Sequence, residues 1–478
     1  MMTRFNIIVE IDKTGGISSK GRKPWIRPHN MRCLTTFFRD KTLSNSNNGK
    51  QNVIIMGRRT WDLLDTDLPF DGRVNVVISK TLKRDVSSGI FIFQSFEDAL
   101  LEISKHKSYG EVWVIGGEQI FDIAIKYIYL CNSIYVTKFK SNYECDQRFP
   151  YNELLELTNY TFDEIATGNL EFDRLLFHPK IIHQEQKYIE LLKYVSDNGI
   201  QRPGVYKDLN TRSIFGRSIK IDVRRNIPIL TTKKMYIDKI IHELLFFVNG
   251  KTNTKELKDV GIDRWDIYTD KNSTSKYGLS EGDIGQSYGF QLRHYNGTYI
   301  GYEHDYSGEG IDQLKIVIDG LRHKEWDNNH IFTLYNPNIL STSLYTPNHG
   351  ILCQFFVEYI AVENGVNKKH ISCMVYQQQS DIFNDLPYVL AFYSILLYMI
   401  CQIVDAKPNE LIINICNAYI YDKNNQQIDN QCKRTPYPWT TLQFKHLDRL
   451  KDIEDFSIES FNVMKYISHP RMVGDMFT

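Results

Sequence analysis

Two glycine-containing turns in the first third of the chain have the residue types of a phosphate-binding site. In IMGRRTW (residues 55–61) and VIGGEQIF (residues 114–121), glycine follows an apolar run and a helix-like segment begins directly after it. Free backbone N–H groups at a helix start, with an arginine nearby, favour phosphate oxygens. A third apolar run, RVNVVIS, is followed by Lys80, so three strand ends could together hold a dinucleotide. Taken singly, such a turn is more often only a tight turn.

The segments around these turns predict the structure that would position them. Six short runs rich in β-branched residues (FNIIVEI, QNVIIMG, RVNVVIS, GIFIF, VWVIGG and SIYVTKF) alternate with helix-type patterns such as SFEDALLEISKH and GEQIFDIAIKYI. Alternation of this kind predicts an α/β domain with a mainly parallel sheet. The run LEFDRLLFHP is expected to be its last strand. We therefore predict a first domain over residues 1–180.

The pattern changes after a boundary that we expect near residues 178–185. A strand pair is predicted around SIFGRSIKIDVRR, then a helix over YIDKIIHELLFFVNG, and several long strands farther on. The regular crossover rhythm is missing, so we predict an α+β domain over residues 185–478. The apolar run at residues 388–404 contains Ser394 and Gln402, which favours a buried helix over a membrane span.

The composition is that of an ordinary globular protein. The 478 residues include 57 basic and 57 acidic side chains, so the net charge gives no reason to expect nucleic acid or an anionic membrane surface as a partner. The eight cysteines are scattered without a CxxC pair or a His/Cys ligand spacing, which argues against a disulfide framework and a metal site. The N-terminus passes directly into an apolar strand. We expect a reducing intracellular compartment, cytoplasmic by default, with an organelle as the alternative.

The first domain resembles dihydrofolate reductase. The motifs that carry the resemblance are FNIIVEID, KPWIRPHNM, IMGRRTW, GRVNVVISK, VIGGEQIF, YVTKF and CDQRFP, and they cover nearly all of residues 5–178. The resemblance implies NADPH as cofactor, and it implies Arg73, for the carboxylate tail of folate, and Thr137 on the substrate side. The residues that it implies for NADPH are Arg58, Arg59, Thr60, Ser79, Lys80, Gly116, Gly117, Glu118, Gln119 and Ile120.

The pterin-binding carboxylate of this family is substituted. Its position, a few residues after the Pro24-Trp25 pair, falls on Asn30. An ionised carboxylate raises the basicity of the ring nitrogen that is protonated before hydride arrives, and losing such stabilisation typically costs about 10²–10⁴ in rate. Glu10, on the strand that lines the same pocket, is an alternative source of a carboxylate. An impaired reductase that still binds NADPH and an active reductase that uses Glu10 are therefore both considered.

The second domain resembles thymidylate synthase from about residue 185 to the C-terminus. The resemblance rests on motifs such as IIHELLFFVNGKTNTKEL, RWDIY, EGDIGQSYGFQLRHY, DYSGEGIDQL, QQSDIF and LPY. A reductase followed by a synthase is the order found in the bifunctional dihydrofolate reductase–thymidylate synthase family. The family's synthase reaction implies a cysteine thiolate that adds to dUMP, arginines for its phosphate, an asparagine on the uracil edge, and a histidine and a tyrosine on the sugar.

Most of these positions carry other residues. The nucleophile's position in TPNH is Asn348, or His349 with a one-residue shift, and neither can make the addition. The nearby Cys353 is expected to be buried in the following strand. The other substituted positions are Gln378, Asn328 and Asn329 for phosphate arginines, Val389 for the uracil-reading asparagine and Tyr419 for the sugar histidine, whereas Glu243, Asp381 and Tyr421 are kept.

Because nucleophile, phosphate cradle, base reader and sugar contact have changed together, we predict a pseudoenzyme of this family. The synthase site would be lost and the reductase site impaired, with residual NADPH binding. We expect a homodimer through the synthase-like domain and a structural, scaffold or regulatory role, with other protein subunits as possible partners in a larger assembly. The alternative is an active dihydrofolate reductase in folate and dTMP metabolism, with or without thymidylate synthase activity.

Overall fold

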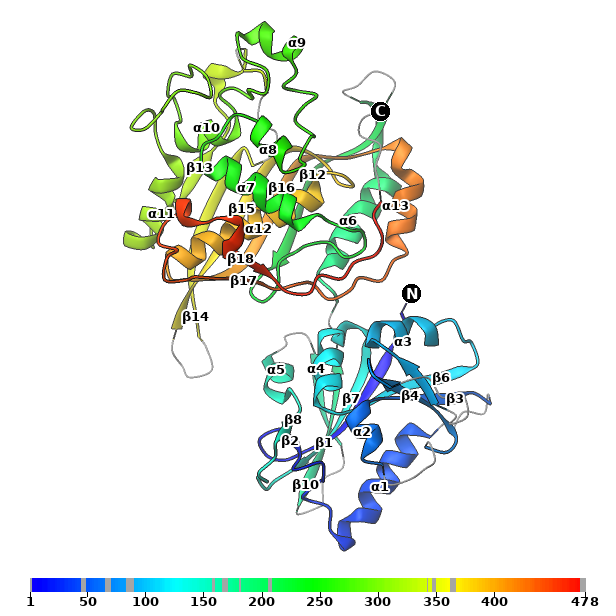
Figure 1. Cartoon of the computed structure of the whole chain (residues 1–478). Coiled ribbons are helices and arrows are strands. Elements are labelled where there is room, and N and C mark those ends of the chain that lie inside the picture. The colour runs from blue at the N-terminus through cyan, green and yellow to red at the C-terminus, as the bar shows by residue number, and fades with distance from the viewer. Residues whose placement is uncertain are drawn as a thin grey trace. The chain divides into compact units, whose positions relative to one another are not determined.

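The computed structural model describes most of the chain and divides it into two compact units, residues 1–183 and 184–478. The described residues are 2–43, 49–64, 70–82, 90–156, 160–165, 171–179, 182–204, 209–341, 343–345, 350–361 and 367–472. The division falls between His183 and Gln184. Each unit has its own sheet and its own covering helices (Figure 1).

The first unit is built on one sheet of predominantly parallel strands. The six β-branched runs of the sequence all form parallel strands, and two antiparallel strands complete one edge. The central strands are buried on both faces, as Val53, Ile54 and Ile55 at 0% exposure show. The strand order is β5 (Ile90–Phe93), β4 (Arg73–Ile78), β3 (Gln51–Gly57), β6 (Tyr109–Gly116), β1 (Phe5–Ile11), β7 (Cys131–Phe139), β10 (Phe172–Pro179) and β9 (Tyr160–Ile165).

Helices of the first unit begin where strands end. The strand β3 ends at Gly57 and the next helix begins at Arg58, and β6 ends at Gly116 with only Gly117 before the following helix. The predicted helix after residue 94 is capped by Ser95, whose hydroxyl accepts a hydrogen bond from the Asp98 N–H at 3.0 Å. The remaining elements are α1 (Pro28–Thr42), α2 (Arg58–Asp62), α3 (Phe96–Ile103), α4 (Glu118–Lys126), η2 (Ile128–Leu130), α5 (Tyr151–Glu156) and the small pair β2 (Gly16–Ser18) and β8 (Gln147–Arg148).

The second unit has a sheet of mixed direction. All neighbouring strands are antiparallel except β15 and β16. The strand pair predicted around residues 213–225 is wrong, because residues 213–222 belong to one long strand and residues 223–225 follow its end. Gly216 has φ +69° within that strand, and the pairing with β16 keeps the same register on both sides of it, from Phe215–Asn417 to Arg217–Ile415. The order is β11 (Ile200–Pro203), β12 (Asn210–Asp222), β16 (Lys407–Tyr421), β15 (Asn367–Asp381), β14 (Leu352–Ala361) and β13 (Ile331–Thr333).

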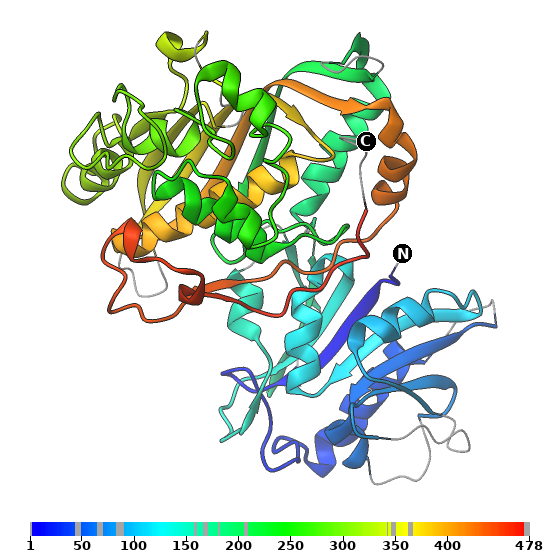
Figure 2. The same ribbon diagram turned by 45° about the horizontal axis from the view of Figure 1, so that its top comes forward.

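The predicted apolar helix is the core of the second unit. It forms α12 (Leu386–Ile403) and packs against β15, β16 and α7 (Ile237–Val248) on one face of the sheet (Figure 2). It is long and apolar enough to span a membrane, but 72% of it is buried inside the unit. The other elements are α6 (Glu185–Asn198), α8 (Lys255–Asp259), α9 (Lys271–Thr274), η3 (Ser275–Tyr277), α10 (Tyr288–Arg293), α11 (Gln313–His323), η4 (Pro337–Ile339), η5 (Asp422–Asn424), α13 (Asn425–Cys432), β17 (Leu442–Phe444), η6 (Ile453–Asp455), η7 (Ile458–Ser460) and β18 (Phe461–Val463).

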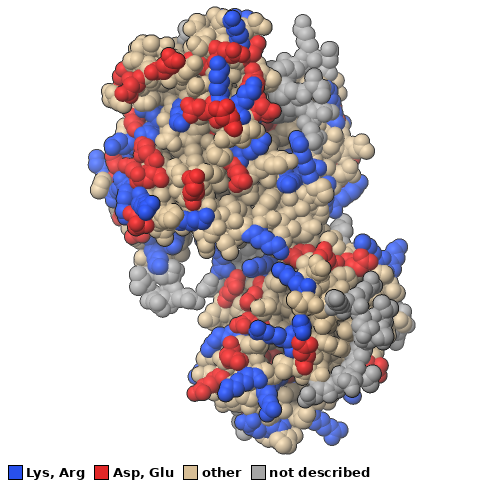
Figure 3. All heavy atoms as spheres, in the orientation of Figure 1, with Lys and Arg blue, Asp and Glu red and all other residues tan. Residues whose placement is uncertain are grey.

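Charged side chains are mixed over the visible surface. Figure 3 shows acidic and basic residues interspersed on both units, with no large region of one sign. This distribution agrees with the formal net charge of zero. Specific partners must therefore be recognised by local sites rather than by a general electrostatic attraction.

Candidate functional sites

The strand order of the first unit brings the three predicted phosphate-binding turns together. Strands β4, β3 and β6 are neighbours and run parallel. Their carboxyl ends are in register, with Gly57 beside Ile78 and Met56 beside Gly116. The carboxyl edge of a parallel sheet is where such folds bind dinucleotides. The three turns therefore form one continuous edge, which we call the dinucleotide edge.

Side chains at this edge connect the turns to one another. Arg58 donates from Nη1 to the Thr81 hydroxyl at 2.7 Å, which joins the start of α2 to the end of β4. The Ser79 hydroxyl accepts the Leu82 N–H at 3.0 Å. A Cβ placed on Gly117 would lie 3.2 Å from the Thr60 hydroxyl oxygen, so α2 approaches the glycine pair closely. The edge is thus held together by its own polar groups.

The other predicted NADPH residues have separate roles at this edge. Arg59, Lys80 and Gln119 are exposed, as residues that contact a ligand from the surface must be. Gly116 has φ +112°, and a Cβ there would lie 2.7 Å from the Phe121 ring, so only glycine fits. The remaining two are engaged internally: Glu118 accepts the Arg148 N–H at 3.1 Å, and Ile120 is buried.

The amide of Asn30 is occupied by the start of α1. Its oxygen accepts the Arg27 N–H at 2.9 Å, and its nitrogen donates to the Trp25 carbonyl and to Glu171, both at 3.0 Å. Asn30 is 3% exposed. Both polar atoms of the Asn30 amide are therefore hydrogen-bonded within the start of α1 and its neighbours.

Leu34, one turn after Asn30, is the residue of α1 that contacts the apolar cluster around Trp25. That cluster also contains Phe139 and Phe172, and Trp25 stacks on Phe139 with ring centroids 5.1 Å apart. The sequence reasoning missed Leu34, because the Pro-Trp spacing selects Asn30. Helical periodicity offered a signal, since residues four apart on a helix share one face.

Glu10 and Thr137 lie side by side on the same face of the first sheet. The two residues are register partners on β1 and β7, and Thr137 is 2% exposed. Glu10 Oε2 accepts a hydrogen bond from Trp25 Nε1 at 3.0 Å and pairs with Lys23 Nζ at 3.1 Å. The carboxylate is only 13% exposed. Arg73, predicted for a carboxylate tail, donates to the Thr42 hydroxyl at 2.8 Å and lies over the Phe70 ring.

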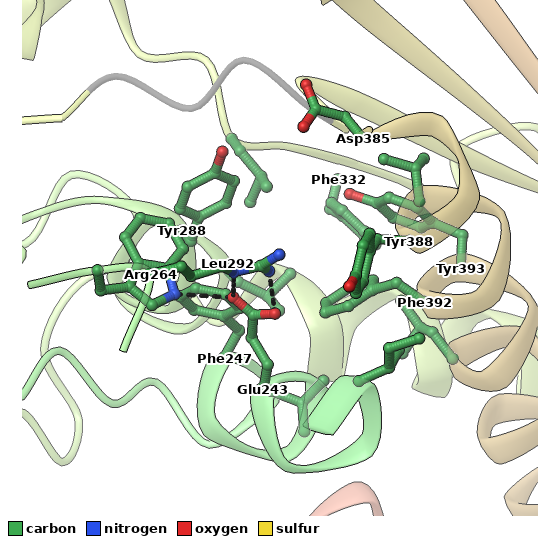
Figure 4. A pocket seen from close by; sticks show the side chains of 16 residues that line it. Glu243, Phe247, Arg264, Tyr288, Leu292, Phe332, Asp385, Tyr388, Phe392 and Tyr393 are labelled. Atoms are coloured by element: carbon green, nitrogen blue, oxygen red, sulfur yellow. Dashed lines mark hydrogen bonds and ion pairs between the residues drawn. The ribbon is translucent and has the colours of Figure 1, made fainter. Parts of the chain in front are cut away.

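A cavity opens in the second unit between α7, α10 and α12, next to β13 (Figure 4). Its volume is about 90 Å³. It brings together two of the predicted synthase positions, Glu243 and Val389. The described residues that line it are Ile240, Glu243, Phe247, Val248, Arg264, Trp265, Tyr288, Leu292, Phe332, Leu334, Asp385, Tyr388, Val389, Phe392, Tyr393 and Leu396.

Glu243 is held by two neighbours at one side of this cavity. Arg264 donates to both of its carboxylate oxygens, with Nε 3.1 Å from Oε1, and Trp265 Nε1 donates to Oε1 at 2.8 Å. Glu243 is 5% exposed in its side chain, whereas Arg264 is 48% exposed. The sequence did not reveal Arg264 as a pocket residue, because nothing local in RWDIY indicates a partner twenty-one residues earlier.

Asp385 contributes the other acidic group of the cavity. Its Oδ2 accepts the Asp381 N–H at 3.3 Å. Burial, and then the adjacent Asp381 carboxylate, raise the pKa of Asp385 to about 7. Asp381 itself accepts the N–H groups of Phe383 and Asn384 at 2.9 and 3.1 Å. The buried Lys233 lies nearby and donates to the Phe383 carbonyl, and burial lowers its pKa to about 8.

Several predicted synthase residues lie outside this cavity. Gln378 is exposed on β15, and Tyr419 and Tyr421 pack edge to face on β16 with ring centroids 5.5 Å apart. Cys353 lies inside β14 at 0% exposure, which confirms the expected buried strand position. Its Sγ is 3.4 Å from Cys373 Sγ, and burial raises its pKa well above the ordinary value.

The predicted nucleophile position lies outside the described residues, and the two asparagines at phosphate positions are hydrogen-bonded to other residues. Asn348, at the nucleophile's position, and His349 lie outside the described residues. Asn329 donates to Asp327 at 2.9 Å, and the Asn328 carbonyl accepts from Gln354 at 3.0 Å. Within the described ranges, no group of three or more His, Cys, Asp or Glu side chains is arranged to hold a metal ion.

Comparison with known proteins agrees with the two units. The family model for dihydrofolate reductase matches residues 4–173, and that for thymidylate synthase matches residues 186–478. The bifunctional dihydrofolate reductase-thymidylate synthases of Glycine max and Zea mays are each 30% identical over 98% of this chain, covering 94% and 96% of those proteins. The Leishmania major protein of the same name is 28% identical over 99% of this chain and 95% of its own length.

These comparisons agree with the resemblance carried by the sequence motifs. The family models match in the same order as the two units, and the relatives are covered over nearly their whole length. The chain belongs to the bifunctional dihydrofolate reductase–thymidylate synthase family, with an α/β reductase domain followed by an α+β synthase domain.

Proposed function

We propose that this chain is a member of its family that no longer makes dTMP, that retains an NADPH-binding reductase domain, and that acts as a structural or regulatory protein. The synthase half lacks the family's nucleophile, since Asn348 or His349 stands at that position. A scaffold subunit of a larger assembly and a modulator of an active relative are the two forms of this role.

The residues at the phosphate positions are the observation that carries the proposal. Gln378, Asn328 and Asn329 stand where the resemblance implies arginines. Asn329 donates to Asp327, and the Asn328 carbonyl accepts from Gln354. A nucleotide phosphate needs charge-assisted hydrogen bonds, each worth about 1.5–3 kcal/mol. Without guanidinium groups at these positions, dUMP loses the interactions that hold its phosphate in the family.

The dinucleotide edge supports retained NADPH binding. The family of the first domain uses NADPH, and the three turns predicted for it form one edge. Lys80 and Arg58, which also pairs with Asp62 at 3.3 Å, supply positive charge there, and α4 begins directly after Gly117. Phosphate oxygens are favoured by such a combination of cations and helix-start N–H groups.

A homodimer through the outer face of the synthase sheet is part of this proposal. Large apolar side chains on that face alternate with buried ones: Leu352 and Phe356 on β14 are 40% and 55% exposed, and Met374 and Tyr376 on β15 are each 41% exposed. Exposed apolar surface of this kind favours association. Sedimentation velocity should show a dimer, and Phe356→Glu should shift it to monomer. A monomeric unsubstituted chain would contradict the homodimer.

The proposed location is a reducing compartment, cytoplasmic by default.

An active reductase is the second candidate, and one observation favours it. The Glu10 carboxylate sits beside Thr137, where it accepts from Trp25 Nε1. The Lys23 ion pair opposes this candidate, because it already neutralises the carboxylate. We therefore rank it second.

Two measurements on the purified chain distinguish the two candidate functions. Isothermal titration should show NADPH binding, weakened about tenfold by Arg58→Gln through the loss of one charge-assisted contact, and unchanged by Arg32→Gln on the exposed face of α1. Incubation with dihydrofolate and NADPH should leave the NADPH absorbance constant. Turnover that disappears in Glu10→Gln would favour the active reductase. Absence of NADPH binding would contradict the proposal that the dinucleotide edge still binds NADPH.

A further inference from the structure

We propose that the synthase domain binds a free amino acid with a large apolar side chain in a second cavity, which lies between α7 and α8. None of the residues that the family resemblance implies for a ligand lines this cavity. The inference goes beyond the proposed function and does not depend on it. Three properties of the cavity carry the inference: its position, its apolar floor and the ion pair at its rim.

The second cavity lies on the opposite face of α7 from the cavity of Figure 4. The helix α8 packs beside α7 (Figure 1). The residues of α7 that line the second cavity are His242, Leu245, Phe246 and Asn249. Their spacing of three and four positions places them on one face of the helix, whereas Glu243 faces the first cavity. No described residue lines both cavities. A ligand in the second cavity therefore does not occupy the first.

Apolar side chains form the floor of the second cavity. Phe246 and Leu257 line it and are 4% and 2% exposed, so the packed core behind them holds them in place. Val260 adds an apolar wall that is 41% exposed. The volume is about 240 Å³, which is below the range of about 300–1,000 Å³ for pockets that hold drug-sized ligands. The cavity therefore suits one apolar side chain of a small molecule, because its burial removes apolar surface from water.

An ion pair at the rim of the second cavity supplies both signs of charge. Lys251 Nζ lies 2.6 Å from Glu256 Oε2, and the two side chains are 49% and 45% exposed. Both residues line the cavity. An exposed pair of this kind contributes little to stability, so a ligand can separate its members at small cost. A ligand that carries an ammonium and a carboxylate replaces this one pair with two, one to each residue.

The balanced charge of this rim selects for a zwitterion. Lys251 and Glu256 are the Lys, Arg, Asp and Glu side chains among the described residues that line the cavity, and their formal charges cancel. A ligand with a single charge pairs with one of them and leaves the other without its partner. An α-amino acid carries both charged groups on the carbon that bears its side chain. The two ion pairs and the apolar contact can therefore form together.

The test uses the full-length protein and L-phenylalanine as the probe. Saturation-transfer NMR and isothermal titration should show binding at one site. Glycine lacks the side chain, phenylalanine amide lacks the carboxylate and N-acetylphenylalanine lacks the ammonium, so each should bind about tenfold more weakly or worse. The last two compounds also represent a phenylalanine at the N-terminus and at the C-terminus of a peptide. Equal or tighter binding of either one would overturn the proposal of a free amino acid.

Substitutions of the rim residues locate the binding site. Glu256→Gln and Lys251→Met each remove one charge from an exposed position and should weaken L-phenylalanine binding about fivefold or more, the loss expected for one charge-assisted hydrogen bond. The matched controls break a second exposed ion pair, in which Lys258 Nζ and Asp266 Oδ2 are also 2.6 Å apart. Neither residue of that pair lines the cavity. Lys258→Met and Asp266→Asn should leave binding unchanged.

A further variant tests the apolar wall. Val260→Asp places a carboxylate beside the carboxylate of the ligand and removes an apolar contact, so it should weaken binding about tenfold or more. Failure of L-phenylalanine to bind, unchanged binding in Val260→Asp, or equal losses in the rim variants and their controls would overturn the proposal. NADPH binding and dTMP formation are measured separately, so failure of this proposal and failure of the proposed function give different results.

Discussion

At the residue scale, the buried carboxylate of Glu185 joins several separate segments of the synthase domain. Glu185 is fully buried, and its oxygens accept the backbone N–H groups of Thr231 and Thr232 and the indole N–H of Trp439. The hydroxyls of the two threonines also donate to it, at 2.7 and 2.6 Å. One side chain thereby fixes α6 to segments that lie far apart in the sequence.

Glu185→Gln is expected to lower the free energy of unfolding by about 2–4 kcal/mol. The amide that replaces one oxygen cannot accept from donors that stay buried. Denaturant titration followed by tryptophan fluorescence measures the change. Glu190→Gln, at an exposed position on the same helix, should change it by less than about 0.5 kcal/mol. Equal effects of the two substitutions would contradict the role of the buried network.

Asp385→Asn should stabilise the chain, and more so at high pH. The pKa of Asp385 is raised to about 7 from its usual 3.8. A group with a raised folded-state pKa contributes stability below its unfolded pKa, and that stability is lost as pH rises through the folded pKa. Asparagine does not titrate, so the gain over the unsubstituted chain should be about 1–3 kcal/mol larger at pH 8 than at pH 5. Denaturant titrations at both pH values measure the difference in the free energy of unfolding. A stabilisation that becomes smaller as the pH rises would contradict the raised pKa of Asp385.

The residues at motif positions could be identified from the sequence, but the side chains with which they form ion pairs could not. The substitutions Gln378 and Val389 follow from the motifs alone. The pairs Arg264–Glu243 and Lys23–Glu10 depend on how separate segments fold against one another. Long-range ion pairs leave no local pattern in a sequence, so the charge of the cavity became visible only in the structure.

At the element scale, α1 carries two residues that contact the Trp25 region, Asn30 at the motif position and Leu34 one turn later. The helix spans Pro28–Thr42, and Asn30 lies in its first turn, where it binds Arg27, Trp25 and Glu171. Counting from the Pro-Trp pair places the family's carboxylate at Asn30. The residue that reaches the Trp25 cluster from this helix is Leu34.

Asn30→Asp is therefore expected not to restore reductase activity. The new carboxylate oxygen would face the Trp25 carbonyl and the Glu171 carboxylate, at the positions where the amide now donates at 3.0 Å. Loss of the donor should lower the free energy of unfolding by about 1–3 kcal/mol. An NADPH oxidation assay with dihydrofolate, together with denaturant titration, checks both outcomes. Substantial turnover in this variant would show that Asn30 does occupy the catalytic position.

Most helices and strands could be predicted from the sequence, because buried elements need apolar residues. The exception lies where a residue allows more than one backbone conformation. The β-branched runs that became β1, β3, β4, β6 and β7 are buried in the sheet, and burial requires continuous apolar sequence. The run predicted as a strand pair contains Gly216, a residue common in turns, which here has a positive φ within one continuous strand. Glycine allows both conformations, so sequence alone could not decide between them.

At the scale of the whole molecule, the two units have separate cores and should unfold separately. The division at residues 183 and 184 leaves a complete sheet in each. Differential scanning calorimetry is expected to show two transitions, and NADPH should raise only that of the reductase domain. At a free concentration one hundred times its Kd, the expected stabilisation is about 2.7 kcal/mol. A shift of both transitions by NADPH, or a single transition, would contradict independent domains.

The central claim is that this family member does not convert dUMP to dTMP. The most direct test incubates the pure full-length chain with dUMP and methylene-tetrahydrofolate, and measures dTMP by mass spectrometry beside an active family member. A fluorinated dUMP analogue in a parallel reaction reports any covalent adduct on the intact chain. We predict no dTMP above the enzyme-free blank and no adduct. Accumulation of dTMP in proportion to the amount of this chain would contradict the claim.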